Sequence, residues 1–160
     1  PKAYKFSRIK NGPNIGAFSG KINHVYTELF FPMKAYFQNL FAYERWANER
    51  ILTALEYPRF PDERCLDLFS HILAAQQTWF NRVRRQNGYV PLWERRDLGE
   101  CRMMFFQLAN LWETYLTDAT DGDFAQSVAY RNTGCEAYET PLTDILAHLI
   151  NHDTYHRGQI

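Results

Sequence analysis

Three of the five histidines in this 160-residue sequence lie near its C-terminal end, as His148, His152 and His156. A spacing of four residues places them on one face of a helix. Ile145 and Leu149 belong to the same face, which indicates that the face is buried. A buried imidazole needs a partner, and a divalent metal ion can be held by two histidines at positions i and i+4.

Two interpretations of these histidines are open from spacing alone. A single histidine on an apolar helix face is usually a packed core residue with a hydrogen bond, whereas His152 and His156 also have the spacing of a metal site. His148 and His156 are too far apart to share one ion, since eight residues of helix span about 12 Å and metal–nitrogen bonds are about 2 Å long. A metal site would therefore need a further ligand from another helix.

Composition excludes several classes of protein. The sequence holds 18 Lys and Arg against 18 Asp and Glu, and this zero net charge argues against a nucleic-acid or membrane-surface partner. Cys65, Cys101 and Cys135 form no CxxC pair and no disulfide framework, which suits a reducing cytoplasm. No apolar run is long enough to span a membrane, and no secretory signal is visible. We therefore expect a cytoplasmic protein with one sizeable core.

Residues 1–32 differ in character from the rest of the chain. The first twenty are rich in Gly, Asn, Ser and Lys without a helical or alternating period, and the segment ends at Pro32. We expect residues 1–32 to be an N-terminal extension, either natural or added for expression, and residues 33–160 to be the functional domain. The extension would be a poorly ordered tail or an arm packed across a neighbouring subunit.

Four segments of the domain have the apolar periodicity of amphipathic helices. They run from about Met33 to Glu56, from about Asp62 to Gln86, from about Leu98 to Thr117, and from Thr140 to the end of the sequence. In the last segment, Thr140 is expected as the N-cap and Pro141 as the first helical residue. Four such helices predict an all-α fold, a four-helix bundle.

A short β-hairpin is expected between the third and fourth helices. Residues 124–130 alternate weakly between apolar and polar side chains, residues 132–134 carry a turn signal, and residues 135–138 could form the returning strand.

The second helical segment supplies a further inward-facing histidine, His71. It shares its helix face with four other residues, Leu68, Ile72, Ala75 and Trp79. Because bundle cores build metal sites from facing helices, His71, His152 and His156 predict a three-histidine site. Such a site keeps coordination positions open, as catalytic zinc does. Neutral imidazoles leave the charge of the ion near +2, which favours an anionic ligand such as hydroxide or thiolate and lowers its pKa.

Three stretches of the sequence resemble the DinB/YfiT-like family of metal-binding four-helix bundles. They are FAYERWAN (41–48), LFSHIL (68–73) with Trp79, and HLINHDTYHRGQI (148–160). The resemblance covers about residues 33–160, and the NHxxxHRGQ pattern is its most specific part. Family members usually continue well past this pattern, whereas the printed sequence ends at Ile160.

The resemblance implies a ligand set and a range of chemistry. In that family, one histidine of the second helix and the two of the HxxxHRGQ motif bind a divalent ion, often zinc or nickel, which implies His71, His152 and His156. His148 would pack beside the site or exchange with one of the ligands. Members are commonly dimers, so a homodimer is expected. The characterised enzymes include thiol-dependent transferases and isomerases that use bacillithiol, mycothiol or glutathione.

Two classes of function follow. The first is a metal-dependent enzyme that transfers a low-molecular-weight thiol to an electrophile, or a hydrolase that uses the same site. The second is a non-catalytic metal-binding or stress-response module, in which the ion only ties two helices together. A coordination sphere closed by a protein carboxylate would favour this class, and an open position beside a cavity would favour the enzyme. A nucleic-acid role is disfavoured by the zero net charge. No general base is assigned; the residues expected to line the pocket or support the ligands are His148, Asn48, Gln76, Tyr155 and Arg157.

Overall fold

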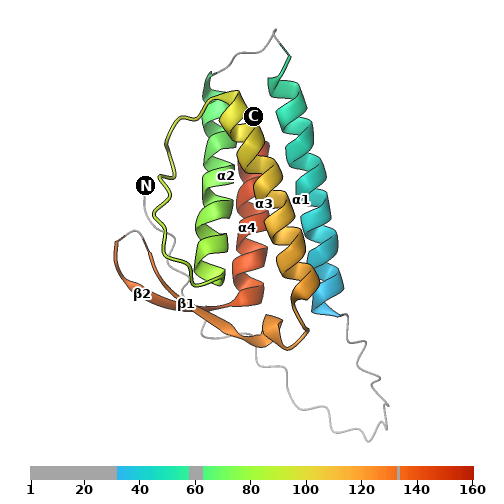
Figure 1. The fold of residues 1–160 in the computed structure, drawn as a ribbon, viewed down its shortest axis with the longest axis vertical. Helices are drawn as coiled ribbons and strands as arrows, with labels where there is room; N and C mark the ends of the chain where they lie inside the picture. Colours follow the sequence, from blue (N-terminus) through green and yellow to red (C-terminus); the bar gives the residue numbers. More distant parts are fainter. Residues whose placement is uncertain (1–31, 58–62, 133) are drawn as a thin grey trace, which may run out of the picture. The chain divides into compact units, whose positions relative to one another are not determined.

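The computed structural model describes residues 32–57, 63–132 and 134–160. Four helices dominate this part of the chain (Figure 1): α1 (Met33–Leu55), α2 (Glu63–Val83), α3 (Leu98–Asp118) and α4 (Leu142–Arg157). The predicted helical bundle with a hairpin between its third and fourth helices is confirmed. The predicted extension, residues 1–32, falls almost wholly outside the described residues, so its role as a tail or an arm stays a prediction.

The packing order of the helices brings the histidine-bearing helices together. α1 packs mainly against α3, α3 against α2, α2 against α4, and α4 against α1. α2 and α4 are therefore neighbours along the bundle (Figure 1). Side chains on the facing sides of two packed helices can reach each other.

Two apolar clusters fill the interior, and polar side chains lie between them along α1. Phe37 belongs to the first cluster and Leu52 to the second. Glu44 and Asn48 lie between these two residues on the same helix and are just as buried, at 3% and 1% exposed. Burying polar groups costs free energy unless they are hydrogen-bonded. The buried polar side chains of Glu44 and Asn48 therefore need hydrogen-bond partners inside the bundle.

The ends of α2 and α3 are fixed by local hydrogen bonds. α2 ends at Val83, three residues before the predicted end, because Arg85 has a left-handed backbone with φ of 53°. The Gln86 amide donates to the Asn81 carbonyl, and the Arg85 amide donates to the Arg82 carbonyl, which is the Schellman arrangement. α3 begins after Asp97, whose side chain forms a reciprocal capping box with Glu100.

The hairpin exists as predicted, but its strands are shifted along the sequence. β1 (Ser127–Arg131) pairs antiparallel with β2 (Ala137–Pro141), and residues 123–125, where the first strand was expected to begin, form a 3₁₀ turn. The predicted N-cap of the last helix is wrong, because Thr140 and Pro141 pair with β1 and α4 starts at Leu142. Among the described residues, no helix is long and apolar enough to cross a membrane.

Candidate metal centre

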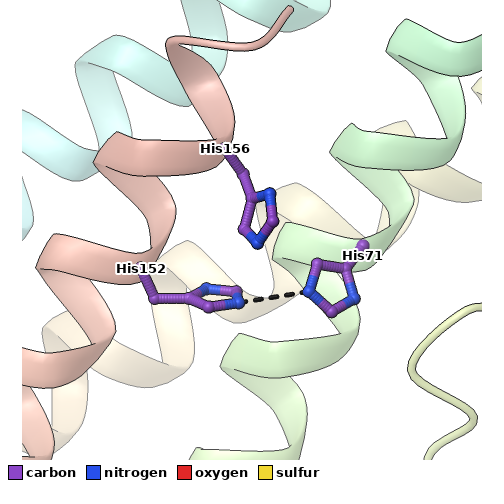
Figure 2. Close-up of side chains that lie close together, drawn as sticks. All are labelled: His71, His152 and His156. Carbon is purple, nitrogen blue, oxygen red and sulfur yellow. Dashed lines mark hydrogen bonds between the residues drawn. The ribbon is translucent and has the colours of Figure 1, made fainter. Parts of the chain in front are cut away.

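His71, His152 and His156 converge between two adjacent helices. His71 projects from α2, and the other two project from successive turns of α4 toward it (Figure 2). One ring nitrogen from each residue can be chosen so that all three lie within 4.8 Å of one another. The Nε2 atoms of His71 and His152 are 3.1 Å apart. Helix geometry explains the pair on α4, because residues four apart stack on one face.

The other ring nitrogen of each histidine contacts an oxygen outside the cluster. His71 Nδ1 lies 2.9 Å from the Leu92 carbonyl, and His152 Nδ1 lies 3.0 Å from an Asp153 carboxyl oxygen. His156 Nδ1 lies 2.8 Å from Gln159 Oε1. Carbonyl, amide and ionised carboxyl oxygens only accept hydrogen bonds, so each Nδ1 carries a proton and donates when Asp153 is ionised. Each Nε2 then has a lone pair available to a metal ion, the usual arrangement behind metal-binding histidines.

The Nε2 atoms of His71 and His152 face each other with their lone pairs. Two lone pairs 3.1 Å apart repel each other unless a cation lies between them. Ligand nitrogens on a tetrahedral ion with bonds of about 2.1 Å would be roughly 3.4 Å apart, close to the observed separation. Burial, with the positive charge of the neighbouring histidines, lowers the pKa of His71 to about 4, and burial also lowers the pKa of His152. A proton is therefore a poor candidate for that cation near neutral pH.

A metal-free arrangement also avoids the repulsion between the Nε2 atoms of His71 and His152. Burial raises the pKa of Asp153 to about 7, against the opposing effects of Gln76 and Arg157. A protonated Asp153 would donate to His152 Nδ1, and His152 Nε2–H would then donate to His71. The histidines would in that case be a structural hydrogen-bond network, so the two arrangements differ by whether an ion is bound.

The loop between α2 and α3 packs on the outer side of the cluster. The Trp93 ring stacks on the His71 ring with centroids 3.8 Å apart and planes 7° from parallel. The preceding residue, Leu92, supplies the carbonyl that accepts from His71. Two consecutive loop residues thus fix both the orientation and the tautomer of one imidazole, although Trp93 itself is 65% exposed.

On the inner side of the cluster, five side chains form a buried polar layer, namely Glu44, Asn48, Gln76, Asp153 and Arg157. Gln76 Nε2 donates to Asp153 Oδ2 at 2.7 Å, while the other carboxyl oxygen of Asp153 meets His152. Arg157 donates to both carboxyl oxygens of Glu44, at 2.5 and 2.6 Å, and to Asn48 Oδ1 at 3.1 Å. Burial raises the pKa of Glu44 to about 7, and the Arg157 guanidinium opposes that rise.

The DinB family model matches residues 32–160, more than half of the chain. The chain belongs to the DinB family. The matched range contains all three stretches on which the resemblance rested, so the prediction of family is confirmed. Searches of curated proteins and of solved structures found no match.

This DinB domain separates the five supporting residues expected from sequence into two groups. Asn48, Gln76 and Arg157 lie in the buried polar layer. The half-buried ring of His148 is 6.0 Å from the His152 ring and 5.6 Å from the Trp79 ring, outside the three-histidine group. Tyr155 is 64% exposed and meets His156 edge-on at 5.1 Å.

Several residues around the site were not expected from sequence, and some had a detectable signal. Glu44 lies seven residues after Phe37 and four before Asn48, so its helical face is that of the core. Asp153 directly follows His152, and adjacent residues do not share a helix face, which hid their contact. Trp93 had no signal, because a loop residue reaches a helix only through the tertiary fold.

Proposed function

We propose that this DinB protein binds a divalent metal ion through His71, His152 and His156 and transfers a low-molecular-weight thiol to an electrophile. The observation that carries the proposal is the orientation of the rings: each Nδ1 meets an acceptor, and the Nε2 atoms converge. Imidazole nitrogens suit zinc and nickel among the divalent ions available to proteins. The donor atoms, their spacing and their supporting hydrogen bonds therefore fit such an ion.

The composition of the cluster favours an enzyme over a structural site. Among the described residues, the group that could hold an ion contains three histidines and no carboxylate. Structural sites usually provide four protein ligands, whereas catalytic sites provide three and keep a position for a small molecule. A divalent ion held there would supply a Lewis acid that lowers the pKa of a thiol and fixes its sulfur for attack.

The roles of the protein's own residues follow from their contacts. Asp153 accepts from His152, which orients the ring and makes Nε2 more basic. Trp93 stacks on His71 and holds that ring against the Leu92 carbonyl. Arg157 is turned away from the histidines toward Glu44, so it positions helix α4 and is not the group that would contact a thiol.

The first experiment measures the metal content of tag-free protein by mass spectrometry. Wild type is compared with His152→Ala, with His71→Ala from the facing helix, and with Asn151→Ala, an exposed neighbour on α4. We expect about one ion per chain in wild type and Asn151→Ala, and a large loss in both histidine variants. No ion, and no uptake of added zinc or nickel, would leave the metal-free network as the correct account.

The second experiment tests the reaction class. Metal-loaded protein is mixed with glutathione, bacillithiol or mycothiol and a chromogenic electrophile such as a chloronitrobenzene, and thioether formation is followed by absorbance. Acceleration that is lost in His152→Ala and after metal removal would support the transferase. Stoichiometric metal without acceleration by any thiol would favour the non-catalytic module, and ester cleavage without thiol would favour the hydrolase that the same site could support. The expected homodimer stays a separate prediction, to be measured by analytical ultracentrifugation.

A further inference from the structure

A cavity of about 600 Å³ lies between α1 and α3 and reaches Gln76 of α2. Small-molecule sites commonly have volumes of about 300–1,000 Å³. His71, His152 and His156 do not line this cavity. The cavity is therefore separate from the proposed metal site and adjoins the opposite side of the buried polar layer.

Two amide side chains of that layer, Asn48 and Gln76, line the cavity. Each has one polar atom that makes no hydrogen bond to the described residues. Asn48 Oδ1 accepts from Arg157, and Gln76 Nε2 donates to Asp153. These partners fix which end of each amide faces them, since a guanidinium only donates. Within the described part of the chain, no hydrogen bond is made by the Nδ2 of Asn48 or by the Oε1 of Gln76. Both residues are nevertheless 95% buried or more.

The two unpaired polar atoms, Asn48 Nδ2 and Gln76 Oε1, must border accessible volume. Among buried side-chain atoms of the described residues, Trp112 Nε1 is the one that is fully enclosed without a partner. Asn48 Nδ2 and Gln76 Oε1 are therefore in contact with accessible volume, and the cavity is the volume that both side chains line. The inner end of the cavity thus presents one donor and one acceptor that the protein does not satisfy, which is costly unless something else does so.

The remaining lining residues define what could enter. Phe41, Phe105 and Trp112 supply aromatic walls. The two acidic residues in the lining are already neutralised, Glu44 by Arg157 and Glu113 by Arg45 at 2.8 Å. No unpaired charge is left among the lining residues to hold an ionised ligand, whereas flat apolar groups would pack well on the rings.

We propose that this cavity is a second ligand site, for a neutral ring-containing molecule that carries a carboxamide or lactam group. Its carbonyl would accept from Asn48 Nδ2, and its N–H would donate to Gln76 Oε1. This inference does not depend on the metal site, because no histidine of the cluster lines the cavity.

The test uses benzamide as the probe, with acetophenone and toluene as controls, titrated into the full chain and followed by ligand-observed NMR. Acetophenone keeps the ring and the carbonyl but lacks the N–H, and toluene lacks both polar groups. A ligand of this size should bind in the millimolar range. Each hydrogen bond lost should weaken binding by about threefold to tenfold. Equal affinity for benzamide and toluene would overturn the proposal.

Amino-acid substitutions show whether benzamide binds in this cavity. Ala109→Phe fills the cavity from α3 and should abolish benzamide binding, whereas Gln107→Phe adds the same ring at an exposed position of that helix and should not. His152→Ala should leave binding intact; its loss there would place benzamide at the histidines and refute the cavity site. If Ala109→Phe does not fold, the side-chain amide signals of Asn48 and Gln76 in the wild type decide, since they must shift on binding and unchanged signals would refute the site.

Discussion

Replacing Arg157 with methionine tests whether the buried polar layer works as described. The side chains of Arg157 and Glu44 are 8% and 4% exposed, and Arg157 also donates to Asn48. Methionine fills a similar volume but leaves Glu44 and Asn48 without their donor. The lost hydrogen bonds should cost about 1 kcal/mol at any pH. A further cost arises wherever Glu44 would be ionised in the wild type.

The size and sign of that further cost follow from the pKa of Glu44. Burial raises this pKa from 4.5 to about 7, so the folded state binds more protons than the unfolded state between these values, and stability falls as pH rises. Without Arg157 the pKa of Glu44 rises further, so Glu44 stays protonated in the folded variant above pH 7. Keeping it protonated destabilises the variant relative to wild type by about 1.4 kcal/mol for each pH unit above 7. The destabilisation should therefore grow from about 1 kcal/mol near pH 5 to about 2–3 kcal/mol near pH 8.

Urea unfolding followed by circular dichroism at a series of pH values measures this difference. The double variant Glu44→Gln with Arg157→Met is the control, because it removes the titrating group together with its partner. The stability of this double variant should itself lose the dependence on pH attributed to Glu44. A penalty for Arg157→Met that is the same at pH 5 and pH 8 would show that Glu44 does not depend on Arg157 for its charge, and would refute the reasoning.

Three further outcomes are expected. Asp153→Asn should weaken metal binding by about 10- to 100-fold in a chelator competition, because it weakens the acceptor that orients a ligand ring; Asp144→Asn, at an exposed position of the same helix, should not. Trp93→Phe should remove most of the tryptophan fluorescence quenching caused by added nickel or copper, since Trp93 stacks on His71. Burial raises the pKa of Cys101 to about 11, so mass spectrometry should find its alkylation near pH 8 far slower than that of exposed Cys135, and equal rates would contradict this.

The sequence was sufficient to predict the bundle and the three convergent histidines for one reason: both depend on helical periodicity. His152 and His156 are one turn apart, and His71 shares a face with Leu68 and Ile72, so an inward direction could be assigned to each from the sequence alone. The residues at which helices and strands begin and end depend instead on individual local interactions. The early end of α2 follows from the backbone conformation of Arg85, which an arginine rarely adopts and which its residue type does not announce.

The start of α4 shows how a tertiary contact overrides a valid local signal. Thr140 followed by Pro141 is a good helix start by residue preference. In the structure both residues pair with β1, and the Leu142 amide donates to the Gln126 carbonyl instead of to a capping side chain. Pairing with a strand that begins fourteen residues earlier fixed this boundary, and a reading of local preferences does not include that strand.

The buried polar layer was hidden for a different physical reason. A glutamate or an arginine in a helical pattern is normally placed on the solvated face, because a lone charge is too costly to bury. Glu44 and Arg157 break that rule only as a pair, and they are 113 residues apart in the sequence. Asp153 is buried likewise through Gln76 and His152. Each burial is acceptable only because the partner is there, so none could be inferred one residue at a time. The layer that supports the histidines on one side and faces the cavity on the other thus becomes visible only when the three helices that carry it, α1, α2 and α4, are brought together.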